Sequence, residues 1–171
     1  MVEIVIERAT LAETDLLIEM HEDAARWLWS RAIHQWEPGT FARDWLNACI
    51  ERGAVYVVRL DGEPVGMAIV QEADEYTWGA RPDDALYLHG LRVLRAYAGR
   101  GIGRAILRWA EEQVAAQRRL YLRLDCMADN TKLRAYYEDA GFRYVSEVTD
   151  EDEPGWRASL YEKRVEAMRA E

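Results

Sequence analysis

The sequence contains few of the residues that form cross-links and metal sites. It has 2 cysteines and 3 histidines among 171 residues. Cys49 and Cys126 lie far apart and form no CxxC pair, so we expect two free thiols and a reducing compartment. His21-Glu22 has no second histidine four residues later, and no other His or Cys spacing is typical of metal ligands. We therefore expect no metal site.

Long apolar runs are also missing. No stretch of about 18 apolar residues occurs, so we expect no membrane-spanning segment. The first ten residues are charged and lack the apolar run of a secretory signal. These two absences predict a cytoplasmic protein.

Positive charge is in deficit. The 22 Lys+Arg against 31 Asp+Glu leave a net charge of −9. Nucleic-acid binding requires cationic neutralisation of phosphates, so this balance argues against a nucleic-acid partner. An acidic surface suits a small cationic partner, although solubility alone also explains it. Half of the residues are hydrophobic, and the length predicts a single domain over 1–171.

Hydrophobic periodicity predicts strands alternating with helices. Thr10 with Glu13 is typical of a capping box, Thr40 of the cap of a second helix, and Asp61-Gly62 of a hairpin turn. We expect a polar loop over 74–84. The expected strands are 3–8, 54–60, 65–70, 86–93, 120–126, 142–148 and 158–165, and the expected helices are 11–28, 41–51, 102–114 and 133–140. The order β-α-α-β-β-β-α-β-α-β-β implies an α/β fold with a mixed, mostly antiparallel sheet flanked by helices.

The most informative segment is Gly99-Arg100-Gly101-Ile102-Gly103-Arg104, between a predicted strand and a predicted helix. Glycine allows positive φ and close approach of the backbone to a ligand. The first amides of a helix have no intrahelical acceptor, and with the helix dipole they can bind a phosphate. The alternative interpretation is a flexible turn with no ligand.

Two common phosphate-binding motifs do not fit this segment. The P-loop requires Gly-Lys-Ser/Thr, which is absent. In the dinucleotide fingerprint G-x-G-x-x-G, the last glycine would be Arg104 or Ile106, depending on the starting glycine. Asp125 follows at the end of the next predicted strand, where a ribose-binding acid would lie. A nicotinamide-binding oxidoreductase therefore stays open as an alternative.

The segment resembles the pyrophosphate loop of the GNAT superfamily of acyl-CoA N-acyltransferases, which reads Gln/Arg-x-x-Gly-x-Gly/Ala after a strand ending in Val. Here Val93 ends the strand, and Ala98 to Gly103 occupies the loop. Ala98 departs from the family pattern, and Arg100 and Arg104 are expected to compensate for it.

The second signature of the family is Asn, then Tyr seven residues later, then Gly-Phe. Asn130, Tyr137 and Gly141-Phe142 match it in this sequence, and the two signatures together cover 86–148. The resemblance implies a GNAT-like fold with acetyl-CoA as co-substrate and no metal. It implies that the coenzyme contacts Leu91, Arg92, Val93, Ala98, Gly99, Arg100, Gly101, Ile102, Gly103, Arg104, Asn130 and Tyr137.

Acetyl transfer needs a proton donor for the departing thiolate. It also needs a hydrogen-bond donor for the thioester oxygen, on which negative charge develops. The resemblance implies that Tyr137 is the general acid, because its pKa of about 10 keeps it protonated. Packing in the core is the alternative role for this tyrosine. The oxyanion donor is expected to be a backbone amide within Leu91–Val93. The side chain of Arg92 is then expected in solvent.

The base that deprotonates the amine is less clearly marked. His89 lies two residues before Leu91 and can accept a proton near neutral pH. Tyr87, Glu72 and Asp74 compete with it for this role. A covalent acyl-Cys126 is a further alternative, but a buried thiol without a catalytic role is the favoured interpretation.

The resemblance implies that the first two helices and their linker wall the acceptor site. Trp36 and Glu72 are the predicted substrate-binding residues. We expect a small cationic amine such as an amino acid derivative, a polyamine or an amine-bearing antibiotic, while a protein N-terminus or lysine stays open. A non-catalytic acyl-CoA sensor of the same fold is the alternative to an enzyme. The late strands allow a homodimer.

Overall fold

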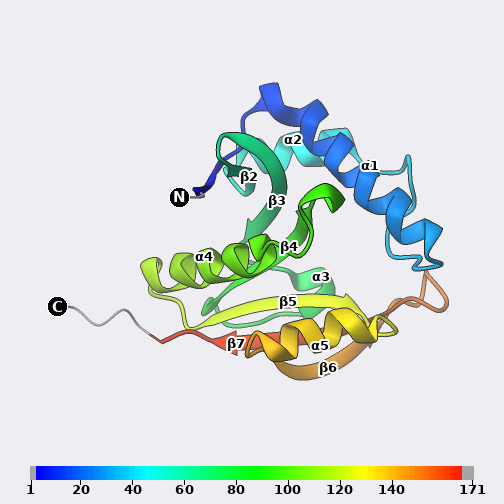
Figure 1. The fold of residues 1–171 in the computed structure, drawn as a ribbon. Coiled ribbons are helices and arrows are strands. Elements are labelled where there is room, and N and C mark those ends of the chain that lie inside the picture. The colour runs from blue at the N-terminus through cyan, green and yellow to red at the C-terminus, as the bar shows by residue number, and fades with distance from the viewer. Residues whose placement is uncertain (1–2, 167–171) are drawn as a thin grey trace. The chain divides into compact units, whose positions relative to one another are not determined.

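The computed structural model describes residues 3–166, which form a seven-stranded sheet with helices (Figure 1). The strands are β1 (Ile4–Arg8), β2 (Val55–Leu60), β3 (Glu63–Gln71), β4 (Ala85–Val93), β5 (Tyr121–Met127), β6 (Arg143–Thr149) and β7 (Arg157–Arg164). The helices are α1 (Thr14–Ser30), α2 (Arg43–Glu51), α3 (Glu75–Trp78), α4 (Ile102–Ala116) and α5 (Thr131–Asp139), with short 3-10 turns η1 (Leu11–Glu13) and η2 (Arg95–Tyr97).

The strand order in the sheet is β1-β2-β3-β4-β5-β7-β6. The pairs β1–β2, β2–β3, β5–β7 and β6–β7 are antiparallel, whereas β4 and β5 run parallel. The parallel pairing spans Ala85–Tyr87 against Tyr121–Arg123. The predicted α/β class, with its mixed, mostly antiparallel sheet, is therefore confirmed.

The chain divides into two compact units, each of which has most of its contacts within itself. The first unit comprises the residues up to Val70 together with Gly90–Trp109, and the second comprises Gln71–His89 with the residues from Ala110 onward. The single domain over 1–171 stays a prediction.

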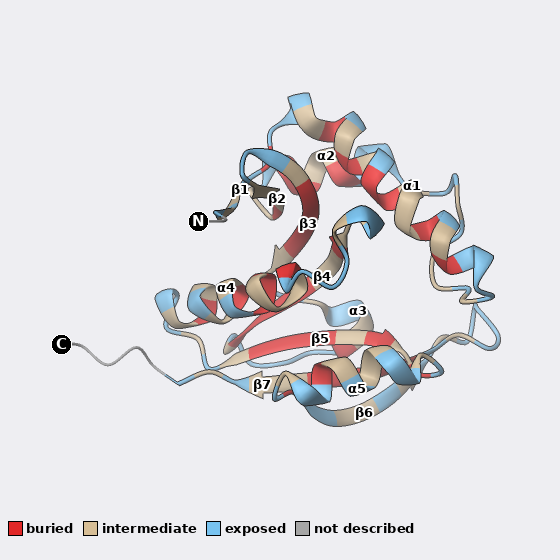
Figure 2. Cartoon of the chain, in the orientation of Figure 1, coloured by how far each residue is buried: buried red, intermediate tan, exposed pale blue. Residues whose placement is uncertain are grey.

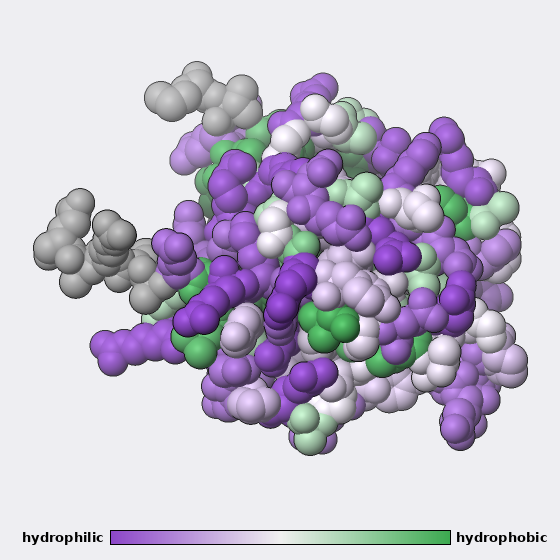
Figure 3. All heavy atoms as spheres, turned by 90° about the horizontal axis from the view of Figure 1, so that it is seen from below, coloured by the Kyte–Doolittle hydropathy of each residue, from purple (hydrophilic) through white to green (hydrophobic). Residues whose placement is uncertain are grey.

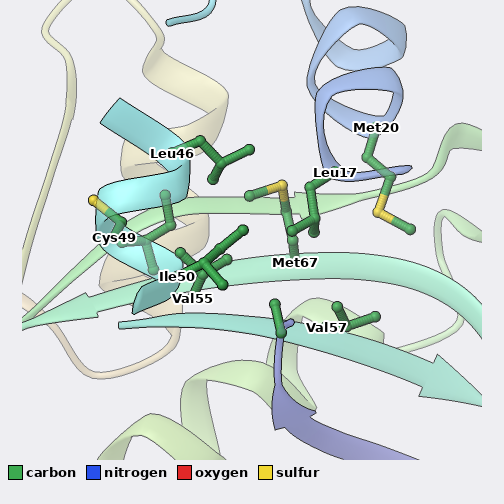
Figure 4. Packing of buried hydrophobic residues seen from close by; sticks show 10 residues of the cluster. Leu17, Met20, Leu46, Cys49, Ile50, Val55, Val57 and Met67 are labelled. Atoms are coloured by element: carbon green, nitrogen blue, oxygen red, sulfur yellow. The ribbon is translucent and has the colours of Figure 1, made fainter. Parts of the chain in front are cut away.

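The first unit has its core where α1 and α2 pack on β2 and β3. Figure 4 shows Leu17, Met20, Leu46, Cys49 and Met67 in this cluster. Leu17, Leu46 and Met67 are fully buried, and burial of each such side chain contributes about 1.5–3 kcal/mol relative to exposure. On α1 the buried positions recur at helical spacing, as the red bands in Figure 2 show. The amphipathic pattern of the sequence thus fixes which face of α1 is covered.

Two local features differ from the sequence expectations. Helix α2 begins at Arg43 with Ala42 as its N-cap, not at Phe41 with Thr40. The hydroxyl of Thr40 donates instead to the carbonyl of Glu37 at 2.7 Å, so it serves the preceding turn. The expected polar loop over 74–84 also contains the single-turn helix α3, because the side chain of Asp74 accepts a hydrogen bond from the amide of Thr77 at 3.1 Å.

The second unit is built around β5, which pairs with β7 along its whole length. A small core of Trp78, Ala85, Tyr87 and Leu160 packs beside it. Figure 3 shows that the surface seen from below consists mostly of hydrophilic residues with isolated hydrophobic ones. Among residues 3–166, no helix combines the length and apolar character needed to cross a membrane.

Candidate functional site

The segment Gly99–Arg104, called the glycine segment below, lies in the first unit and connects η2 to α4. Gly99 and Gly101 adopt φ of +77° and +78°, values that side chains rarely tolerate. A Cβ at either position would meet no atom within 4 Å, so open space surrounds both glycines. The amide of Ala105 donates to the carbonyl of Gly101 at 3.0 Å, which is the first backbone bond of α4. Amides of the preceding first turn have no intrahelical acceptor and can receive an anion.

The side chains of this segment include a buried anchor, Ile102, and an exposed cation, Arg100. Ile102 is 1% exposed and fixes the start of α4 in the core. Arg100 is exposed and lies over the ring of Tyr97, 5.1 Å from its centroid. Ala98 has extended backbone geometry, and Gly103 and Arg104 lie in the first turn of α4. Backbone donors therefore dominate what this segment offers a ligand.

The end of β4 contradicts one sequence expectation. Arg92 is 6% exposed and not in solvent, whereas its neighbours Leu91 and Val93 are half-buried. Gly90, with φ of +57°, makes room for this side chain, because a Cβ at Gly90 would lie 2.7 Å from Nη1 of Arg92. The backbone of β3 also lies close to Arg92, because a Cβ at Gly66 would be only 2.5 Å from the carbonyl oxygen of Arg92.

In the second unit, His89 lies between two carboxylates. Its Nε2 atom is 3.4 Å from Oδ2 of Asp74, and its Nδ1 atom is 3.8 Å from Oδ1 of Asp125. Neither Nε2 of His89 nor Oδ2 of Asp74 has a hydrogen-bond partner among the described residues. Burial raises the pKa of Asp125, and Asp74 raises it further, while His89 acts in the opposite direction.

The same three side chains offer metal-ligand atoms within 4.8 Å of one another. However, Asp74 faces one ring nitrogen of His89 and Asp125 faces the other. One ring nitrogen nonetheless lies within 4.8 Å of an oxygen of each carboxylate.

The other three candidate bases lie in different surroundings. The hydroxyl of Tyr87 accepts a hydrogen bond from Arg123 at 3.0 Å in the buried interior. Glu72 is at the surface, with its side chain 75% exposed and 3.8 Å from Arg119. Asp74, in contrast, contacts His89 directly. Asp74 is thus better placed to support His89 than to replace it.

Tyr137 and Cys126 are both buried in the second unit. Tyr137 is 7% exposed, and burial raises its pKa, with further increases from Cys126, Tyr136 and Asp125. Burial also raises the pKa of Cys126 to about 12. Tyr137 therefore keeps its proton at neutral pH, and Cys126 stays a thiol with little nucleophilic thiolate. Cys49 and Cys126 are both free, as expected.

Asn130 is the N-cap of α5, and its side chain accepts a hydrogen bond from the amide of Leu133 at 3.1 Å. This capping contact uses one lone pair of the amide oxygen and leaves the amide NH₂ available. The capping role that the sequence suggests is therefore formed.

An aromatic cluster in the first unit contains the predicted pocket residue Trp36. The ring of His21 stacks on Phe41 with centroids 4.0 Å apart and lies 5.4 Å from Trp36. Arg92 lies over Trp36 at 4.2 Å. Sequence reasoning considered His21 only as a zinc ligand and missed its place here. The available signal was the spacing Leu17-His21-Ala25, which puts His21 on the buried face of α1.

A surface pocket of about 320 Å³ lies in the second unit at the loop between β6 and β7. Aromatic and acidic side chains meet there, including Tyr76, Trp156, Asp150 and Glu151. The hydroxyl of Tyr76 donates to Asp150. This combination can hold an ammonium group through charge and cation–π contact.

Comparisons with known proteins agree with these features. The sequence model of the acetyltransferase (GNAT) family matches residues 21–142. The chain is similar to the uncharacterized N-acetyltransferase YesJ of Bacillus subtilis, with 32% identity over 151 residues, which cover 84% of this chain and 80% of that protein.

Solved structures share the fold. A GNAT acetyltransferase of Listeria monocytogenes has a TM-score of 0.78 at 24% identity, covering 94% of each chain. The PaiA N-acetyltransferase of Thermoplasma acidophilum, solved with coenzyme A, has a TM-score of 0.73 at 18% identity, covering 95% of this chain and 99% of that one. The acetyltransferase yncA of Salmonella typhimurium, solved with acetyl-CoA, has a TM-score of 0.70 at 16% identity, covering 99% of this chain and 98% of that one.

Proposed function

This chain belongs to the acetyltransferase (GNAT) family, and we propose that it transfers the acetyl group of acetyl-CoA to a small cationic primary amine. Family membership makes the chain an acetyl-CoA-dependent acyltransferase. The acceptor class and the roles of individual residues are the proposal.

The observation that carries the proposal is the glycine segment of the first unit. Gly99 and Gly101 have left-handed backbone geometry with open space around them, directly before the N-terminus of α4. Backbone amides at such a helix start bind phosphate oxygens. We assign the coenzyme pyrophosphate to this segment, with Arg100 and Arg104 as nearby cations. Two relatives of the same fold were solved with coenzyme A or acetyl-CoA.

His89 is the proposed base. An alkylammonium is protonated at pH 7 and must lose a proton before it attacks the thioester carbonyl. The proton passes to the imidazole, and the flanking Asp74 and Asp125 stabilise the resulting imidazolium. The amine then forms the new C–N bond, and a backbone amide within Leu91–Val93 donates to the carbonyl oxygen as negative charge develops.

Tyr137 is the proposed acid for the second half of the reaction. The C–S bond breaks, and the electron pair leaves on the sulfur of coenzyme A. Because burial raises the pKa of Tyr137, its hydroxyl stays protonated and available to the sulfur. Its proton moves to the thiolate, and solvent returns a proton to the tyrosine. The nitrogen, positively charged after its attack, loses its second proton to solvent and so becomes the neutral amide. Asn130, at the start of the same helix, is assigned to the pantetheine arm through its free amide group.

Acidic and aromatic side chains support a cationic acceptor. Asp150 and Glu151 line the pocket at the β6–β7 loop together with Trp156. Trp36 and Glu72 remain the proposed acceptor contacts from the sequence. The pocket, of about 320 Å³, has room for a small molecule.

Release of coenzyme A from acetyl-CoA, measured with a panel of amines, tests the proposed activity. We expect amine-dependent release with small primary amines and no release with tertiary amines, which cannot form an amide. Cys126→Ala should retain the activity, because the reaction uses no acyl-cysteine. Loss of turnover in Cys126→Ala with intact folding would favour a covalent intermediate instead.

The role of His89 needs its own variant. His89→Gln removes the base while keeping a polar group of similar size. We expect kcat to fall by roughly 10²-fold, with partial recovery at high pH, where more of the amine is already neutral. A variant whose kcat shows no recovery up to pH 10 would contradict the base role.

A further inference from the structure

Two arginines are buried among the described residues, and their surroundings differ. Arg123 is 4% exposed and forms ion pairs with Asp84 and Glu162, both at 3.2 Å. Arg92 is 6% exposed, yet no described carboxylate lies within ion-pair distance of it. Burial opposes the charge on Arg123, but its hydrogen bonds raise its pKa overall. Burial lowers the pKa of Arg92 to about 9, which still leaves it charged at neutral pH.

The guanidinium of Arg92 is held from one side only. Its Nη1 atom donates to the carbonyl of Gly90 at 3.1 Å and contacts the sulfur of Met67 at 3.6 Å. Its Nε atom is buried without a hydrogen-bond partner. A Cβ at Gly90 would lie 2.7 Å from Nη1, so the glycine makes room for the guanidinium. Because Nη1 is already engaged, the edge formed by Nε and Nη2 is left for a ligand. Such an edge can bind a carboxylate with two parallel hydrogen bonds.

A second unpartnered group lies in the same cluster. His21 is 3% exposed, and its Nδ1 atom has no partner among the described residues. Burial, together with the charge of Arg92, lowers the pKa of His21 to about 4, so the ring is neutral. Trp36 and Phe41 contact both groups, with Arg92 4.2 Å and 5.4 Å from the two rings. Thus two buried polar side chains contact the same aromatic rings, and each has one nitrogen without a hydrogen-bond partner among the described residues.

A desolvated cation is unfavourable unless it is paired. Contact with two aromatic faces compensates only part of this loss. An anion would complete both groups, because a carboxylate accepts two hydrogen bonds from Arg92 and one from the N–H of neutral His21. Planar bidentate recognition of this kind is the chemistry for which arginine is preferred over lysine.

We propose that Arg92 and His21 form a receptor for a carboxylate group, and that the acceptor amine is one that also carries a carboxylate, as an amino acid does. The inference rests on the proposed acetyl transfer and narrows its acceptor class. Trp36, predicted from the sequence as a substrate contact, then covers the guanidinium on one face. The assignment of Arg92 to the coenzyme concerns its backbone on β4 and is compatible with this role of its side chain.

The alternative is that Arg92 is a structural anchor for the aromatic segment. The two roles predict opposite stabilities for Arg92→Met, which fills similar space without charge. If Arg92 is a structural anchor, Arg92→Met loses its stabilising contacts and should unfold at a lower temperature than the wild type. A receptor without its ligand carries an unpaired buried charge, so the variant should be at least as stable as the wild type.

Thermal unfolding with a simple carboxylate tests binding without any turnover. We expect 50 mM sodium propionate, against sodium chloride of equal ionic strength, to raise the Tm of the wild type by about 2 °C, as for a dissociation constant of roughly 20 mM. Arg92→Met should show no such rise, and Arg92→Lys a smaller one. The matched control is Arg95→Met, since the exposed Arg95 also lies over a tryptophan, 3.8 Å from the ring of Trp27. It should respond to propionate like the wild type.

Acceptor pairs that differ only in the carboxylate provide the second readout. L-phenylalanine is compared with phenethylamine, and L-methionine with 3-(methylthio)propylamine. We expect a preference of at least tenfold in kcat/KM for the carboxylate member, abolished in Arg92→Met. Absence of a propionate effect on the wild type, or an equal effect in Arg92→Met, overturns the receptor. A propionate effect specific to Arg92 without acetyl transfer to any amine would instead retain the receptor and contradict the proposed function.

Discussion

At the residue scale, one physical cause gives three buried groups their protonation states. Removal from water disfavours the charged form of any titratable side chain. It keeps Tyr137 as a hydroxyl, Cys126 as a thiol and His21 as a neutral ring. The raised pKa of Tyr137 also makes complete transfer of its proton to a thiolate harder than at an exposed tyrosine. We therefore expect the hydrogen bond from Tyr137 to the sulfur to supply most of its effect before the proton moves.

Tyr137→Phe removes this donor and keeps the ring that packs near Phe142 and Tyr161. We expect kcat to fall by roughly 10²-fold, with the KM for acetyl-CoA changed little. Because the pKa of Tyr137 lies above its ordinary value, the tyrosine should cause no loss of kcat up to about pH 10. Steady-state rates across pH 6–10 measure both effects.

The neighbouring Tyr136→Phe serves as the control for a general loss of aromatic hydroxyls. It should keep wild-type kcat. A Tyr137→Phe enzyme with undiminished kcat would contradict the acid role and leave this side chain with a packing role alone.

His21 makes the stability of the protein depend on pH. Its pKa is about 4 in the folded chain, against an ordinary 6.5, so between these values the unfolded chain binds the additional proton. The resulting stability is complete above about pH 6.5 and is lost as the pH falls toward 4, by about 3 kcal/mol in all. Urea unfolding at pH 7 and pH 4.5 measures the difference between wild type and His21→Gln. The exposed His34→Gln is the control and should follow the wild type.

At the element scale, two glycines on neighbouring strands make room for Arg92. Gly66 on β3 lets the backbone of Arg92 approach, since a Cβ there would lie 2.5 Å from the carbonyl oxygen of Arg92. Gly90 on β4 makes room for the guanidinium, since a Cβ there would lie 2.7 Å from Nη1. The absence of both side chains thus lets Arg92 occupy its buried place in the aromatic cluster of the first unit.

The glycine segment allows a test of backbone geometry without a steric change. At Gly101 an added Cβ meets nothing within 4 Å, but the φ of +78° is strained for alanine, by about 1 kcal/mol or more. We expect Gly101→Ala to relax this backbone and misdirect the amides at the start of α4. The KM for acetyl-CoA should then rise about tenfold, an effect of about 1.4 kcal/mol, with kcat less affected.

Gly62→Ala is the matched control for that substitution. Gly62 has φ of +86°, and a Cβ there would also meet nothing within 4 Å, but it lies in the β2–β3 turn. It should lower the unfolding temperature by a similar few degrees and leave the KM for acetyl-CoA unchanged. Equal KM values in Gly101→Ala and wild type would remove the glycine segment from coenzyme binding.

At the scale of the whole molecule, the order of elements followed from local patterns, whereas the site depended on long-range contacts. Alternation and helical spacing predicted every strand and each long helix, because both periodicities are properties of adjacent residues. The short α3 was missed, since one turn has too few residues for a period. The burial of Arg92 was also missed, because it depends on contacts with Trp36 and Phe41, which are distant in the sequence. The pairing of His89 with Asp125 needs the parallel register of β4 and β5.

The charge of the whole chain leads to a prediction about coenzyme association. A net charge of −9 repels the anionic coenzyme over the Debye length, which is about 30 Å at 0.01 M salt and about 10 Å at 0.1 M. The helix start of α4 and Arg100 attract it only at short range. Added salt therefore removes more repulsion than attraction, and we expect the association rate constant of coenzyme A to rise by roughly two- to fivefold over this salt range. Stopped-flow tryptophan fluorescence measures it, and Arg100→Gln should lower the rate at each salt concentration while the rise persists. A rate that falls with salt in the wild type would mean that the local cations outweigh the acidic surface in guiding the coenzyme.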